Sequence, residues 1–270
     1  MHKLFTFTVA LALALPATAA PASETLVVCS PGAPGTTDEA QPTMDALASA
    51  ISGKAKIAIG AVYEPSEHGG IARMQKAGLA LVSLPFFLAH ERELGLHARL
   101  VAVQKGRPAL DRWALVAQKG RISSASSLAG FTILASTASE PAFVRGIVLG
   151  KLGVLPATAK LSTSAAVLSG LRHAADGSAV AVVLDGTQLA ALASLPFKDK
   201  LEVATASDPL PAGIVATIDA RLPGTAWTAI DAALRGLDAR ALDAVQLAGF
   251  QPIDPGALDA ARHAFASAAP

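Results

Sequence analysis

The sequence has few of the residues that build several common kinds of functional site. It contains 1 cysteine in 270 residues, which excludes an internal disulfide framework and any zinc or iron–sulfur site built on several cysteines. Charged residues make up 16% of the chain and aromatic residues 4%. The 22 Lys and Arg residues are balanced by 21 Asp and Glu residues. No basic run could neutralise a phosphate backbone, so we expect no nucleic-acid partner.

The common motifs of catalytic and nucleotide-binding sites are also missing: G-x-S-x-G, H-E-x-x-H, G-x-x-x-x-G-K-[ST] and G-x-G-x-x-G do not occur. His90, Glu93 and His97 have a helical spacing that could bind a metal. Gly95 interrupts that helix, however, and the charged neighbours favour an exposed surface. His68, with carboxylates nearby, is more typical of a polar loop tip. We therefore expect no catalytic residue, no metal and no cofactor.

An apolar stretch at the start of the chain predicts export. His2 and Lys3 precede an apolar run over residues 4–15, and Ala17-Thr18-Ala19 follows after a proline. This order is typical of a secretory signal peptide, which we place at residues 1–19, and the run is too short to span a bilayer. A buried helix is the alternative, but it would show a polar face. The sequence thus predicts a protein exported to the periplasm.

Strand-like and helical stretches alternate along the rest of the chain, which predicts an α/β fold with mainly parallel sheets. The predicted strands are residues 26–29, 56–61, 79–83, 100–103, 113–117, 131–135 and 180–184, and the predicted helices are residues 44–51, 70–76, 86–94, 142–152 and 165–174. Cys29 ends the first strand, where we expect it to be a small buried residue. Lipid attachment there is disfavoured because the bulky Val28 precedes it.

Two connecting segments indicate crossings between lobes. Residues 104–112 are polar and contain Gly106 and Pro108, and residues 205–213 contain Asp208-Pro209-Leu210-Pro211, which cannot be helical before its prolines. We predict one lobe from residues 20–104 and 206–270, a second from residues 105–205, and a ligand cleft between them. Residues 226–269 should form two or three helices packed on the first lobe.

The order of these features resembles a divergent periplasmic substrate-binding protein of the phosphate/phosphonate (phosphite) ABC-transporter type. The resemblance spans nearly the whole predicted mature chain and rests on residues 78–87, 113–122, 127–133, 135–141, 179–185 and 208–213. It implies a type II fold of two lobes, each a mainly parallel sheet flanked by helices. It also implies a two-stranded hinge, closure on a small-molecule ligand and delivery to an inner-membrane transporter.

The turn expected to bind the ligand departs from that family. Family members grip an oxyanion with Ser and Thr hydroxyls and with free N–H groups at helix N-termini. Ser136, Thr137 and Ser139 keep the hydroxyls, but Glu140 and Pro141 follow them. Either Thr137 caps the next helix and Glu140 completes a capping box, or Pro141 starts the helix and Glu140 is the cap. In both cases a carboxylate stands where an anion would bind.

Other turns supply further candidate ligand contacts. The complete set of predicted ligand-binding residues is Thr36, Thr37, Tyr63, Glu64, Ser83, Phe86, Phe87, Ser136, Thr137, Ser139, Glu140 and Asp185. The paired phenylalanines could instead be core residues. Aromatic rings and carboxylates suit a dianion poorly, so the sequence favours a largely apolar or neutral ligand, lipid-like and even sterol-like.

Three functions therefore remain open. The first is a monomeric periplasmic solute-binding protein for such a neutral ligand. The second is an oxyanion-binding component of an ABC importer, in which Ser136, Thr137 and Ser139 grip the anion and Glu140 faces solvent. The third is a secreted enzyme or assembly subunit that reuses the fold.

Overall fold

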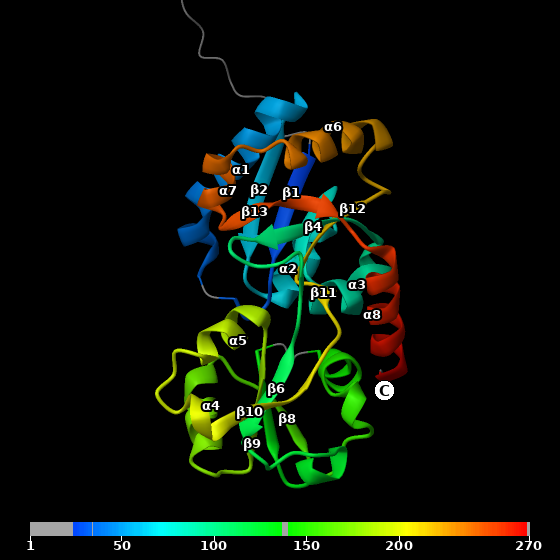
Figure 1. Ribbon diagram of the computed structural model, residues 1–270. Helices are drawn as coiled ribbons and strands as arrows, with labels where there is room; N and C mark the ends of the chain where they lie inside the picture. The colour runs from blue at the N-terminus through cyan, green and yellow to red at the C-terminus, as the bar shows by residue number, and fades with distance from the viewer. Residues whose placement is uncertain (1–23, 34, 137–139, 269–270) are drawn as a thin grey trace, which may run out of the picture.

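Two large β-sheets, connected by a small one, organise the computed structural model, which describes residues 24–33, 35–136 and 140–268 (Figure 1). The first sheet has the order β13-β4-β12-β3-β1-β2, and the second has the order β10-β6-β9-β7-β8. The first contains β1 (Glu24–Cys29), β2 (Ile59–Glu64), β3 (Leu79–Ser83), β4 (Leu96–Gln104), β12 (Gly213–Ile218) and β13 (Leu247–Pro252), and the second contains β6 (Ala114–Gln118), β7 (Thr132–Ala135), β8 (Lys160–Thr163), β9 (Val180–Leu184) and β10 (Leu201–Ala206).

Both sheets are mixed, which corrects the prediction of mainly parallel sheets. Strands β2 and β3 pair with β1 in parallel, as β8 and β9 do with β7. By contrast, β12 runs antiparallel to both β3 and β4, and β6 runs antiparallel to both β9 and β10. Strands β6 and β12 directly follow the two crossings. A parallel pair needs a crossover connection, usually a helix, between its strands, and neither crossing contains one, so these two strands pair antiparallel with their neighbours.

A short antiparallel pair joins the two lobes. It consists of β5 (Leu110–Asp111) and β11 (Leu210–Pro211), with Leu210 opposite Asp111. Both strands lie inside the segments that the sequence predicts as crossings. The two-stranded hinge is thereby confirmed, whereas the predicted lobe boundaries stay a prediction.

The helices cover the sheets. They are α1 (Thr37–Ala55), α2 (Glu67–Met74), α3 (Leu84–Leu94), α4 (Val167–Ala175), α5 (Gly186–Leu192), α6 (Gly224–Arg235), α7 (Ala239–Ala244) and α8 (Pro255–Ala268), with a π-helix η2 (Phe143–Val148) and three short 3₁₀ turns, η1 (Ala125–Leu128), η3 (Gly150–Leu152) and η4 (Lys198–Lys200). Helices α6 and α7 pack on α1 in the first lobe. Gly95 ends α3 with a positive φ of 65°, so the predicted break after Leu94 is confirmed.

The C-terminal segment is a correction to the sequence prediction. It contains the strand β13, and its last helix, α8, packs against both lobes (Figure 1). In the first lobe, Arg262 of α8 makes a 2.8 Å ion pair with Glu91 of α3. In the second, the backbone of α8 lies so close to η2 that a Cβ at Gly146 would overlap the carbonyl of Ala264. Helix α8 is therefore a strap across the hinge.

Two predictions about the start of the chain have different outcomes. Cys29 is fully buried at the end of β1, as predicted, and burial together with the charges of Glu64 and Glu67 raises the pKa of its thiol to about 12. The predicted signal peptide, residues 1–19, lies outside the described residues. Within the described ranges, no helix is both long and apolar enough to cross a membrane.

Candidate ligand-binding cleft

A cavity of about 260 Å³ lies between the lobes beside the hinge. Its described lining is Ser30, Pro31, Gly32, Ala33, Ser83, Pro85, Gln104, Asp111, Trp113, Ser136, Asp185, Gly186, Thr187, Gln188 and Ala212. These residues come from both lobes and from the hinge itself. A ligand held there would contact both lobes and the hinge.

Strand direction explains why polar residues meet in this cavity. Ser30 follows β1, Ser83 ends β3, Ser136 follows β7 and Asp185 follows β9. The carboxyl ends of neighbouring parallel strands share one edge of a sheet, which is where open α/β sheets bind ligands. The two lobes turn these edges toward each other, since all four residues line one cavity.

Both carboxylates in the lining make hydrogen bonds inside the protein. Asp185 caps α5: its Oδ1 accepts a 2.8 Å hydrogen bond from Gln188 N, and the Gln188 side chain accepts a 3.1 Å bond from Asp185 N. The Arg107 guanidinium donates two hydrogen bonds to Asp111 Oδ2, one of them from Nε at 3.0 Å. The Asp111 carboxylate also occupies the space that a Cβ at Gly186 would need.

No lysine, arginine or histidine belongs to the described lining of the cavity. The nearest compensation that the structure shows is the guanidinium of Arg107, which is paired with Asp111. Asp185 has no such ion pair among the described residues. The lining therefore combines hydroxyl and amide groups with two carboxylates. Asp111 forms an ion pair with an arginine, whereas Asp185 forms no ion pair with a described residue.

A hydrogen bond between the lobes closes one side of the cavity. Thr187 Oγ1 of α5 donates to Gln104 Oε1, at the end of β4, over 3.1 Å. On another side, a Cβ at Gly32 would lie 3.2 Å from the carbonyl oxygen of Ser136. Gly32 also has a φ of 84°, so both its conformation and its close approach to the second lobe favour glycine.

A larger and mainly apolar cavity, about 720 Å³, adjoins the first. The two cavities share Ala33, Gln104 and Thr187. Its apolar lining includes Val28, Met44, Leu47, Leu81, Val245 and Leu247, and Tyr63, Lys105 and Arg107 also line it. Lys105 is paired with Asp243 at 2.7 Å, so neither of its cations is free of an acidic partner.

The structure brings only some of the predicted ligand residues into the cleft cavity. Ser83, Ser136 and Asp185 line it. Thr137 and Ser139 lie outside the described residues. Thr36 caps α1 by a reciprocal capping box with Glu39, with the backbone hydrogen bonds at 2.9 and 3.3 Å. Thr37 is the first residue of that helix and is not part of the cavity lining.

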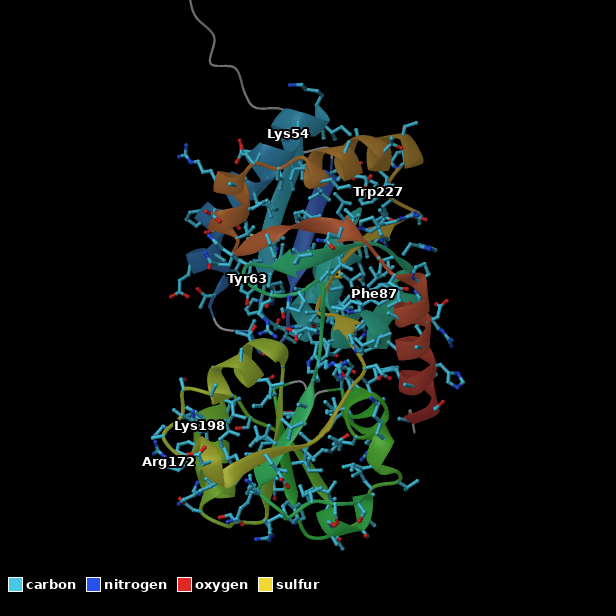
Figure 2. All side chains as sticks on the ribbon, in the orientation of Figure 1. Lys54, Tyr63, Phe87, Arg172, Lys198 and Trp227 are labelled. Atoms are coloured by element: carbon cyan, nitrogen blue, oxygen red, sulfur yellow. The ribbon has the colours of Figure 1, made fainter. Side chains whose placement is uncertain are left out.

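The phenylalanine pair lies in the core, which is the alternative that the sequence left open for these two predicted ligand contacts. Phe86 and Phe87 are 1% and 0% exposed, because the first turn of α3 presents both rings to the interior of the first lobe. Phe86 packs on His90 with ring centroids 4.7 Å apart. The guanidinium of Arg262, a residue of α8, lies 5.6 Å from the centre of the Phe87 ring. Figure 2 shows Phe87 beside α8.

Tyr63 and Glu64 also lie away from the cleft cavity. The Tyr63 hydroxyl donates a long 3.5 Å hydrogen bond to Ala33 O, and the residue lines the larger apolar cavity. Glu64 accepts hydrogen bonds from the Ser66 hydroxyl at 2.7 Å and from Arg73 Nε at 3.1 Å. These bonds, first that of Ser66, lower the pKa of Glu64 despite its partial desolvation.

Glu140 lies at the lobe interface but not in the described lining of the cavity. Helical residues begin at Pro141, and the backbone carbonyl of Glu140 accepts hydrogen bonds from Phe143 N and Val144 N at 3.0 and 3.3 Å. This confirms the alternative in which Pro141 starts the helix. Burial, and then the nearby charge of Glu67, raise the pKa of the Glu140 carboxyl to about 7.

Four important lining residues were not predicted: Gln104, Asp111, Trp113 and Gln188. Gln104, Asp111 and Trp113 belong to or flank the first crossing. Because the ends of a crossing lie at the cleft in a two-lobe fold, their position beside the crossing could have identified them. Gln188 could have been found as the third residue after Asp185, because that spacing is typical of a capping box.

Comparison with known proteins supports the two-lobe architecture. The sequence matches no family model and no curated protein. Among solved structures, a Xanthomonas citri protein bound to a chloride ion has a TM-score of 0.71 at 14% identity, over 90% of this chain and 98% of that one. It has also been solved bound to ATP.

Two further solved structures are also similar to this chain. The binding component of an ABC phosphonate transporter from Pseudomonas aeruginosa has a TM-score of 0.62 at 16% identity, over 91% of this chain and 87% of that one. PhnD1 from Prochlorococcus marinus, in complex with methylphosphonate, has a TM-score of 0.62 at 11% identity, over 91% and 98%. The chain thus has the two-lobe fold of type II periplasmic binding proteins, as the sequence predicted.

Proposed function

We propose that this chain is a periplasmic solute-binding protein that captures a small ligand of low negative charge between its lobes and delivers it to an inner-membrane transporter. It would be exported by a signal peptide at residues 1–19 and act as a monomer, with lobes formed by residues 20–104 with 206–270 and by residues 105–205. The fold it shares with the binding component of an ABC phosphonate transporter supports this proposal. Binding is favoured over catalysis because no histidine in the described lining could serve Ser83 or Ser136 as a base.

The observation that carries the proposal is the charge of the cavity lining. Asp111 and Asp185 line it without a lysine, arginine or histidine in the described set. Two like charges about 5 Å apart repel by about 3 kcal/mol at an effective dielectric constant of about 20. Because a phosphate or phosphonate dianion carries two negative charges, Asp185 would repel it about twice as strongly. A neutral or cationic polar group could instead form hydrogen bonds with the same lining.

The shape of the two cavities narrows the ligand further. A polar end would occupy the 260 Å³ cavity, and an apolar body would extend past Ala33 into the adjoining 720 Å³ cavity. This preserves the neutral ligand expected from the sequence but moves its apolar contacts from Phe86 and Phe87 to residues such as Met44 and Leu247. A ligand without a polar group, as a bare hydrocarbon would be, leaves the hydroxyl and amide groups of the cleft unpaired.

One specific observation favours an oxyanion as the second candidate. The hydroxyls of Ser30, Ser83 and Ser136 line the cleft, and the side chain of Ser83 makes no capping hydrogen bond at the N-terminus of α3. Helix N-termini favour negative charge. A structurally similar protein is described in complex with methylphosphonate.

The substitution Asp185→Asn separates the two candidates. Asparagine caps helices as well as aspartate does, so α5 should be kept. We would titrate wild type, Asp185→Asn and the exposed control Asp199→Asn with methylphosphonate and with a neutral monoacylglycerol by calorimetry. We expect wild type to bind the monoacylglycerol and not methylphosphonate, with affinity for methylphosphonate gained only in Asp185→Asn. Tight methylphosphonate binding by wild type, with no response to the monoacylglycerol, would establish the oxyanion candidate instead.

A further inference from the structure

Three side chains with metal-binding atoms meet at the lobe interface, outside the described cavity lining. They are Glu67 of α2, His90 of α3 and Glu140, which immediately precedes the helical turn at Pro141. One ligand atom from each lies within 4.8 Å of those of the other two. The first two belong to the first lobe and Glu140 to the second, so the group exists only while the lobes are together.

The histidine presents one ring nitrogen to Glu67 and the other to Glu93. His90 Nε2 lies 3.1 Å from Glu67 Oε1, and His90 Nδ1 lies 3.4 Å from Glu93 Oε2. The ring packs on Phe86, and the His90 side chain is only 12% exposed. A carboxylate behind a metal-ligating histidine is a common arrangement, because it fixes the ring and leaves the other nitrogen for the metal. Glu93 has that position here.

The charge of this group is not balanced by the protein. None of Glu67, Glu93 and Glu140 forms an ion pair with a lysine or arginine among the described residues. In the form that binds a metal, with both carboxylates ionised and the imidazole neutral, the three ligands carry a charge of −2, which one divalent cation neutralises. The half-buried position of Glu140 makes that neutralisation more valuable, since water screens the repulsion less than at an open surface.

We propose that Glu67, His90 and Glu140 form a binding site for one divalent transition-metal ion, of the Zn²⁺ class, that bridges the two lobes. Imidazole and carboxylate oxygens together suit Zn²⁺ and similar ions, and three protein ligands leave a further position for water. Tetrahedral ligands at about 2.0–2.1 Å from zinc lie about 3.3 Å from one another. Side-chain rotations would contract the group to that size. Metal binding at this site would hold the cleft closed.

Zinc and cobalt titrations of the full chain, after treatment with a chelator and dialysis, test the site. We expect one equivalent of Zn²⁺ to bind by calorimetry, and Co²⁺ to give visible absorption bands typical of low coordination. Glu140→Gln and His90→Gln should each weaken Zn²⁺ binding at least tenfold. Glu93→Gln should weaken it about 10- to 100-fold, as is usual for a carboxylate behind a ligating histidine. His68→Gln is the matched control, because this exposed histidine adjoins Glu67 but lies outside the group.

Each possible result bears on the proposal. No Zn²⁺ binding, or equal binding by wild type and all variants, would overturn it. If Glu67→Gln and His90→Gln weaken binding but Glu140→Gln does not, the ion sits on one lobe and the bridging site is wrong. Far-UV circular dichroism of each variant identifies loss of folding, and the near-isosteric Glu140→Gln gives the decisive measurement. Small-angle scattering should show a smaller radius of gyration with Zn²⁺ in wild type and no change in Glu140→Gln.

Discussion

At the scale of single residues, the environment of Glu140 should make the stability of the protein depend on pH. Its carboxyl faces Glu67 and His90 across the lobe interface, and burial followed by the charge of Glu67 raises its pKa from 4.5 to about 7, against a smaller lowering effect of His90. Between these two values the folded chain holds a proton that the unfolded chain has lost. The fold is therefore less stable when the Glu140 carboxyl is ionised than when it is protonated. The free energy of unfolding falls as the pH rises from about 5 to 7.

Replacing Glu140 by glutamine should remove this titration. In the presence of a chelator, the Tm of Glu140→Gln should exceed that of wild type above pH 7 and approach it near pH 4.5. Because the carboxyl is half exposed, solvent screening reduces the effect to about 1 kcal/mol, or about 2–4 °C in Tm. Thermal unfolding from pH 4.5 to 8 measures it, with the exposed Asp199→Asn as control. A difference in Tm between Glu140→Gln and wild type that does not change with pH would contradict this prediction.

At the scale of elements, the contact between η2 and α8 depends on a glycine. The π-helix closes with a hydrogen bond from Leu149 N to Val144 O over 3.0 Å, and Gly146 lies at its centre. Its missing side chain lets the backbone of α8 approach at Ala264. An added methyl group would overlap backbone, which cannot move aside as a flexible side chain does.

The substitution Gly146→Ala should therefore destabilise the protein by about 1–3 kcal/mol, despite the better helix propensity of alanine. The matched control is Gly150→Ala, where the nearest atom to a new Cβ is Arg145 O at 3.8 Å and no overlap arises. Urea unfolding of both variants gives the comparison. Equal stability of the two would show that the backbone contact contributes little.

Sequence periodicity located several buried elements but missed β12, an almost fully buried strand between β4 and β3. The predicted strands at residues 79–83 and 180–184 coincide with β3 and β9, which are apolar runs in the middle of their sheets. Exposed or irregular elements were missed. Strand β8 is mostly exposed at a sheet edge, and β13 contains Gly249, which has a φ of 152° and lies at a register shift. Such strands lack the apolar pattern that identifies a strand.

The candidate site was predictable only in part, for a related reason. Ser83 ends a strand that was recognised, and Ser136 and Asp185 follow two others, so their place at the cleft could be inferred. Phe86 follows the same strand as Ser83, but the start of a helix sends successive side chains in different directions, and only the structure shows that its ring enters the core. The association of Glu67 and His90 with Glu140 depends on how the lobes meet, which no local pattern encodes.

At the scale of the whole molecule, Trp113 is positioned to report on the cleft. It is 5% exposed, lines the cavity just after the first crossing and contacts Phe143 edge to face, with ring centroids 5.2 Å apart. The chain has 2 tryptophans. The other, Trp227, lies on α6 in the first lobe, far from the second lobe (Figure 2), with Arg99 over its ring.

Ligand binding between the lobes should therefore change the fluorescence of Trp113. In Trp227→Phe, the neutral amphiphile proposed above should shift or quench the emission with the same dissociation constant that calorimetry gives. The reciprocal variant, Trp113→Phe, should show little change on the same titration. A signal carried by Trp227 alone would place the ligand outside the cleft.

The packing of α8 against both lobes should link hydrogen exchange in this helix to the opening of the lobes. Opening must separate α8 from η2 or from α3, because Ala264 packs on the second lobe while Arg262 is paired with Glu91 in the first. Each opening event should then loosen the last turns of α8. The amide hydrogens of those turns would exchange with solvent at a rate set by the frequency of opening, and a ligand or ion that holds the lobes together should slow that exchange in a helix it never touches.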